Sequence, residues 1–92
     1  LLIVAEDSIH PDLVELHTTI ASEATSREHP AHDHYARRYE NVRTFATRVF
    51  EALAEQGRLR SPLTPAQLGA SFVALMDGLQ LQWLYDRSAV RP

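Results

Sequence analysis

Residues 64–85 constrain the fold more than any other segment, because they predict one helix with two apolar faces. Thr64 can act as N-cap, Pro65 as the first helical residue and Gln67 as the partner of Thr64 in a capping box. At about 100° per residue, one side collects Leu68, Phe72, Leu75, Met76, Leu79 and Trp83. The other side collects Ala70, Val73, Ala74, Leu81 and Leu84 around the charge of Asp77, with Gly69 and Gln80 on one edge between the sides. Such a helix must be covered twice.

The length of the chain makes that double cover difficult. A domain of 92 residues buries only about 60–65% of the surface of its unfolded chain. A second subunit would supply the missing cover, and the alternative is a monomeric bundle with this helix at its centre. Asp77, Gln80 and Gln82 interrupt the apolar run, whereas a membrane span needs about 20 apolar residues. We therefore expect no membrane partner.

Composition excludes several classes of function. The formal net charge is −3, and all nine basic residues are arginines, which form no concentrated cationic stripe. This segment is therefore not expected to bind nucleic acid by itself. The chain has no cysteine, so it has no disulfides, thiolate nucleophiles or thiolate metal ligands. The lack of cysteine fits a reducing compartment, and we expect a cytoplasmic location.

The rest of the sequence predicts further helices. Residues 11–24 form an amphipathic pattern that begins with a proline. A longer helix is predicted over residues 30–56, about 40 Å in length, with Gly57 as its left-handed C-cap. The short connection after Gly57 makes the two long helices an antiparallel hairpin. Residues 1–5 predict the end of another helix, and neither end of the chain carries a cap. The prediction is an all-α antiparallel helical bundle, truncated at both ends.

Catalytic and metal motifs are missing from the sequence. His29, His32 and His34 cluster along the chain, but His32 and His34 would point about 160° apart on a helix. No Gly-rich phosphate loop, HExxH motif or nucleophile elbow occurs. We therefore expect no metal, no cofactor and no enzymatic activity.

Aromatic residues on the inner faces of the three predicted helices can line a ligand cavity. Apolar walls supply affinity there, and a few polar groups orient the ligand. The predicted ligand-binding residues are His17, Ile20, Tyr35, Tyr39, Phe72, Met76 and Trp83. The alternative is that the same side chains fill an ordinary core, in which His17 is satisfied by a polar neighbour.

Three segments of the chain resemble the C-terminal domain of TetR/AcrR-type transcriptional regulators. They are Ala-Ser-Glu-Ala-Thr at 21–25, His-Pro-Ala-His at 29–32 followed by Tyr35 and Arg38-Tyr39, and Ala-Leu-Met-Asp-Gly-Leu-Gln-Leu-Gln-Trp-Leu at 74–84. The resemblance implies that residues 1–92 are an all-α effector-binding and dimerisation domain. In such regulators an N-terminal helix-turn-helix domain, which this sequence lacks, binds operator DNA. A small molecule then changes the spacing of the two DNA-reading heads.

The leading hypothesis is therefore the regulatory domain of a ligand-responsive repressor that acts as a homodimer on operator DNA. The predicted dimer interface is the second face of helix 65–85, with Val73, Ala74, Asp77, Leu81 and Leu84. The Phe72, Met76 and Trp83 face is predicted to pack on helix 30–56 around the cavity. One alternative is a helical protein-interaction module without a ligand pocket. A second is a small metal-dependent enzyme that uses His29 and His32.

Overall fold

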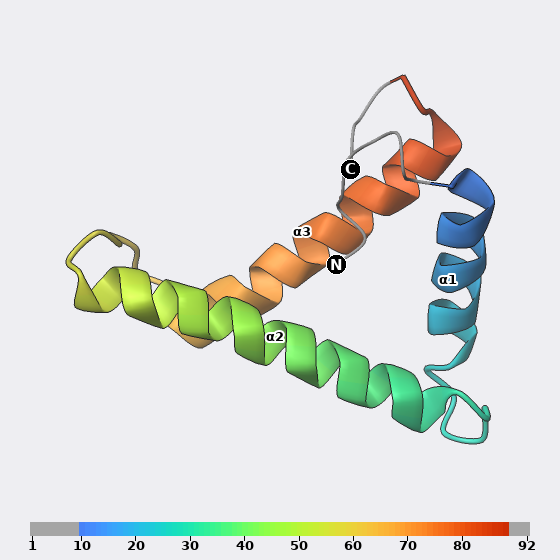
Figure 1. Cartoon of the computed structure of the whole chain (residues 1–92), viewed down its shortest axis with the longest axis horizontal. Helices are drawn as coiled ribbons and strands as arrows, with labels where there is room; N and C mark the ends of the chain where they lie inside the picture. Colours follow the sequence, from blue (N-terminus) through green and yellow to red (C-terminus); the bar gives the residue numbers. More distant parts are fainter. Residues whose placement is uncertain (1–9, 89–92) are drawn as a thin grey trace.

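The structure is a computed structural model, and it describes residues 10–88. Three helices occur in this range: α1 (Pro11–Glu23), α2 (His32–Glu55) and α3 (Pro65–Tyr85). Residues 10–88 contain no strand, so the all-α prediction is confirmed. Helices α2 and α3 form the predicted hairpin, and α1 closes the third side of an open triangle (Figure 1). The helix end predicted at residues 1–5 lies outside the described range.

Helix α3 begins as predicted. The Thr64 hydroxyl accepts a hydrogen bond from the backbone N–H of Gln67 (3.1 Å), and the Gln67 side chain accepts one from the backbone N–H of Thr64 (2.9 Å). This reciprocal pair satisfies two amides that the helix itself leaves unpaired. None of the described helices is long and apolar enough to cross a bilayer.

The C-terminal end of α2 agrees with the prediction, and the N-terminal end does not. Gly57 has φ of +68°, and the N–H groups of Arg58 and Gly57 donate to the carbonyls of Leu53 and Ala54. This is a Schellman C-cap, which confirms the predicted role of Gly57. At the other end the prediction was wrong, because α2 starts at His32 and residues 24–31 form turns. The backbone N–H of Ala31 donates to Nδ1 of His29 (3.0 Å), and this local bond holds the preceding segment in a turn.

The close contact between α2 and α3 is centred on Gly69. A Cβ atom added to Gly69 would lie 2.5 Å from Oγ1 and 2.9 Å from the backbone N of Thr47, so the two backbones approach closely there. Val73, one turn further along, is only 5% exposed, and Gln80 lies on the same side of α3. The expectation that α2 leaves the Val73 side of α3 bare is therefore wrong, although Phe72 on the other predicted face does lie beside Phe50 of α2. A glycine edge admits the neighbouring backbone more closely than a row of aromatic side chains does.

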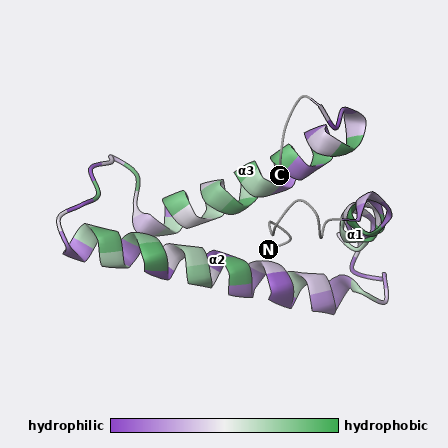
Figure 2. Cartoon of the chain, turned by 45° about the horizontal axis from the view of Figure 1, so that its top comes forward, coloured by the Kyte–Doolittle hydropathy of each residue, from purple (hydrophilic) through white to green (hydrophobic). Residues whose placement is uncertain are grey.

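The buried core of residues 10–88 is small. Its buried apolar residues are Val14, Ala24, Ala46 and Val73, and no large side chain of this range is fully buried. The Cα radius of gyration is 15.0 Å, against about 12 Å for a compact domain of this length. Hydrophobic residues run along α3 and through the second half of α2 (Figure 2). Much of this apolar surface has no cover from the described part of the chain.

Candidate functional site

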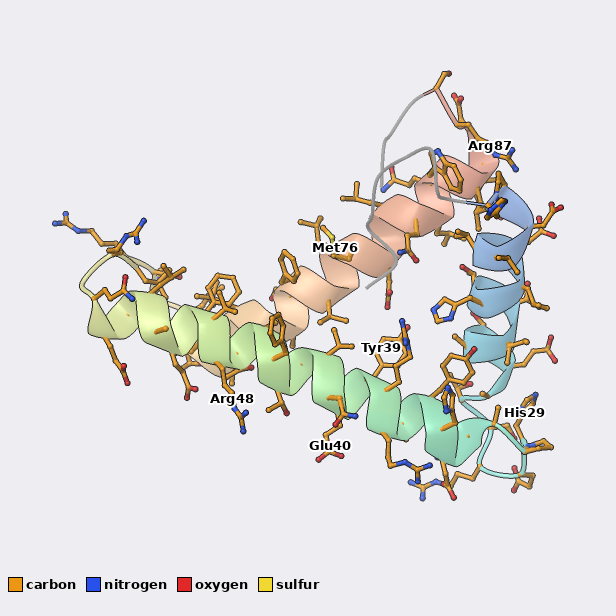
Figure 3. The ribbon with its side chains drawn as sticks, viewed as in Figure 1. His29, Tyr39, Glu40, Arg48, Met76 and Arg87 are labelled. Atoms are coloured by element: carbon orange, nitrogen blue, oxygen red, sulfur yellow. The ribbon has the colours of Figure 1, made fainter. Side chains whose placement is uncertain are left out.

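Polar side chains from all three helices meet inside the triangle. The hydroxyl of Tyr39 on α2 donates a hydrogen bond of 2.7 Å to Oδ2 of Asp77 on α3. Tyr39 projects from α2 into the space between the helices (Figure 3). Burial first, and then the bond to Asp77 and its negative charge, raise the pKa of Tyr39 to about 12. Tyr39 therefore stays protonated as a hydrogen-bond donor to Asp77 at neutral pH.

Helix α1 contributes His17 to this cluster. The ring of His17 lies 5.5 Å from the ring of Tyr35, centroid to centroid, in a tilted contact. Burial lowers the pKa of His17, and the nearby Arg38 cation lowers it further, while Asp77 opposes both effects. At neutral pH the imidazole is therefore uncharged, with one donor and one acceptor nitrogen.

Gln80 completes the cluster from α3. It is 5% exposed, and its side chain forms no hydrogen bond with any other described residue. No buried side-chain nitrogen or oxygen of the described residues lacks a hydrogen-bond partner, so the amide atoms of Gln80 reach solvent, where they can bond a guest molecule. The sequence did not identify Gln80 as a site residue. The one sequence feature that pointed to Gln80 was its position on the edge between the two apolar faces of the helix.

A cavity of about 340 Å³ opens beside the cluster, between α1 and α3. Its walls include His17 and Thr18 of α1, Tyr39 of α2, and Asp77, Gln80 and Leu81 of α3. The wall therefore combines apolar surface with a carboxylate, an amide, an imidazole and a hydroxyl. Such a combination can hold a small molecule in one orientation.

Only some of the predicted ligand-binding residues come together at this cavity. His17 and Tyr39 line it, whereas Tyr35 does not line it and packs against the ring of His17. Phe72 instead lines an apolar groove between α2 and α3, with its ring 6.5 Å from that of Phe50. The remaining three, Ile20, Met76 and Trp83, line neither the cavity nor the groove. Trp83 lies under the Arg87 guanidinium, whose carbon is 5.3 Å from the ring centre.

The predicted dimer-interface residues divide between the inside and the outside of the chain. Val73 is buried, and Asp77 is half-buried in its bond with Tyr39. Ala74 and Leu81 are exposed, and Leu84 is half-buried. Ala74 and Leu81 are thus accessible to a second subunit, and the interface itself stays a prediction.

The histidines at the start of α2 form local hydrogen bonds. Nδ1 of His32 lies 2.7 Å from the carbonyl oxygen of Ala24, at the end of α1, and Nδ1 of His29 accepts from Ala31. His34 packs edge-on against Tyr35. Within residues 10–88, no group of three His, Asp or Glu side chains is placed to hold a metal ion.

Comparison with known proteins identifies one family. The family model described as BetI-type transcriptional repressor, C-terminal, matches residues 2–92. No curated protein and no solved structure matches the chain.

Proposed function

On the premise that the chain belongs to the BetI-type repressor family, as a C-terminal domain of the TetR class, we propose that it is a ligand-responsive regulatory domain. In this proposal it binds a small-molecule effector, forms a homodimer and controls operator binding by an N-terminal DNA-binding domain. It acts in the cytoplasm, as a repressor, and catalyses no reaction.

The observation that carries the proposal is the cavity of about 340 Å³ with Gln80 at its wall. The Gln80 amide, which lines this cavity and forms no hydrogen bond with another residue of the range 10–88, is proposed to bond the effector. His17 and Tyr39 orient the effector, and Tyr35 supports His17. We assign no effector contact to Ile20, Phe72, Met76 or Trp83, because they do not line this cavity.

The proposed dimer interface is one exposed side of α3. Ala74 and Leu81 lie exposed on it, and Leu81 also lines the cavity. An effector that contacts Leu81 can therefore favour one arrangement of the two subunits over another. A coupling of about 1–3 kcal/mol would change operator affinity by roughly 5–150-fold.

The test combines ligand binding with oligomeric state. The purified chain is screened against a small-molecule library by ligand-detected NMR, and its mass is measured by sedimentation equilibrium. We expect a dimer and saturable ligands whose binding is lost in Gln80→Leu and kept in Arg43→Gln, a charge change on the outer face. A monomer at high concentration, or a chain that binds only a different protein, would contradict the proposal.

A further inference from the structure

One face of α2 changes character along its length. At about 100° per residue, His34, Arg38 and Asn41 occupy the same face as Phe45, Val49 and Ala52. The first half of the face is therefore basic and polar, and the second half is apolar, as the hydropathy colouring of α2 shows (Figure 2). The acidic residues of α2, Asp33, Glu40, Glu51 and Glu55, all fall outside this face.

The apolar half of this face borders a groove of about 580 Å³ between α2 and α3. Its walls are formed by Val42, Phe45, Ala46, Val49, Phe50 and Phe72. Phe45 is 70% exposed and Val49 is 45% exposed, so the groove is open along its outer edge. No residue of this lining also lines the proposed effector cavity.

At Asn41 and Val42 the groove meets a basic recess that extends toward the start of α2. His34, Arg37 and Arg38 line this recess, together with Asn41 and Val42, which they share with the groove. No acidic residue lines either space, and neither arginine forms an ion pair within residues 10–88.

We propose that the groove and recess together bind a medium-chain carboxylate, with its alkyl chain against Phe45, Val49 and Phe72 and its carboxylate at Arg37 and Arg38. The charge pattern selects this occupant, because an aliphatic chain gains affinity from apolar walls and an anion gains it from guanidinium groups. Between Arg38 and Phe45 the helix rises by about 11 Å, which is close to the length of an extended octanoate or decanoate. The lining of this site shares no residue with that of the proposed effector cavity, but its Arg38 also lies near His17 and Asp77. Binding of the carboxylate does not depend on the chain being a regulator.

The charge requirement is tested on the whole chain by calorimetric titration with octanoate, decanoate and decanol. We expect affinity to rise about fourfold per added methylene and decanoate to bind at least about tenfold more tightly than decanol. The double variant Arg37→Gln/Arg38→Gln should lose that advantage. The matched control, Arg43→Gln/Arg48→Gln, removes the same charge from two residues of α2 that line neither the groove nor the recess, and it should bind decanoate normally.

The position of the alkyl chain is tested separately with Val49→Glu. Because Val49 is already 45% exposed, the variant should keep its helical circular dichroism while losing at least tenfold in decanoate affinity. Equal binding of decanol and decanoate, or equal loss in both arginine pairs, would overturn the proposal. It would also be overturned if Val49→Glu dissociated a dimer that decanoate cannot compete with, because the groove would then be an interface between copies. Binding to anionic phospholipid vesicles without binding to decanoate would overturn it as well.

Discussion

Tyr39 and Asp77 form the one side-chain to side-chain hydrogen bond that joins two helices within residues 10–88, at 2.7 Å. It bridges α2 and α3 at a distance from their close contact at Gly69. We expect Tyr39→Phe to destabilise the fold by about 1–3 kcal/mol, because the half-buried carboxylate of Asp77 loses its donor. Urea unfolding measures the change. Tyr35→Phe is the matched control, because the Tyr35 hydroxyl has no hydrogen bond among the described residues, and it should change stability little.

The same bond predicts a stability change at alkaline pH. The pKa of Tyr39 is raised to about 12 in the folded state, from its ordinary value of 10.0. The folded protein therefore holds this proton more tightly than the unfolded chain does. The stabilisation is complete below pH 10 and is lost as pH rises from 10 towards 12. Between pH 10 and 12 the free energy of unfolding should fall less steeply with pH for Tyr39→Phe than for the unaltered chain. Identical slopes of free energy against pH would argue against the assignment.

His17 predicts the opposite behaviour at acidic pH. Its pKa is lowered from 6.5 by burial and by the Arg38 cation, so the folded state binds this proton less tightly than the unfolded chain does. The stabilisation is complete above pH 6.5 and decreases as pH falls through the folded-state pKa. His17→Gln should reduce this acid sensitivity. NMR titration of the His17 ring tests the cause directly, and a midpoint at or above 6.5 would contradict it.

Two glycines of α3 provide a matched pair for testing the helix contact. The Cβ of Gly69→Ala would meet Thr47 at 2.5 Å, so we expect a loss of about 1–3 kcal/mol as the helices separate. A Cβ atom added to Gly78 would meet no neighbouring atom within 4 Å. Gly78→Ala should therefore be neutral or stabilising by up to about 1 kcal/mol, since alanine favours the helix. If both substitutions had the same effect, Gly69 would not mark the close contact.

The proposed interface is tested with two substitutions on different sides of α3. Ala74→Arg places a charge on the proposed dimer side and should weaken dimerisation at least about tenfold. Leu75→Arg places the same charge on another exposed side and should leave it unchanged. Sedimentation equilibrium over a range of concentrations measures both constants. If Leu75→Arg weakened dimerisation more than Ala74→Arg does, the interface would instead lie on the Leu75 side of α3.

Local signals in the sequence predicted local structure well. Thr64 and Gln67 formed the expected capping box, Gly57 formed the expected C-cap, and the family resemblance was confirmed by the match to residues 2–92. The predicted start of α2, at residue 30, was wrong. The ring of His29 closes a turn before the helix, and Pro30 alone does not predict that turn.

The packing of α3 was harder to predict. Periodicity divides a helix into faces but does not say which face another backbone approaches. Gly69 decided that question through its missing side chain, and Val73 and Gln80 were buried as a result. The partnership of Tyr39 and Asp77 depends on the same packing, so it could not be derived from either helix alone.

The contact between Gly69 and Thr47 lies near the start of α3, so the effect of any rotation about it would increase along the helix. From Gly69 the rest of α3 extends about 24 Å to Tyr85, and α2 and α3 diverge along that length (Figure 1). A rotation of about 5° at the contact would therefore displace the far end of α3 by about 2 Å, roughly the size of helix shifts in allosteric proteins. A movement too small to disturb the packing at Gly69 would be amplified at the end of α3 that faces α1.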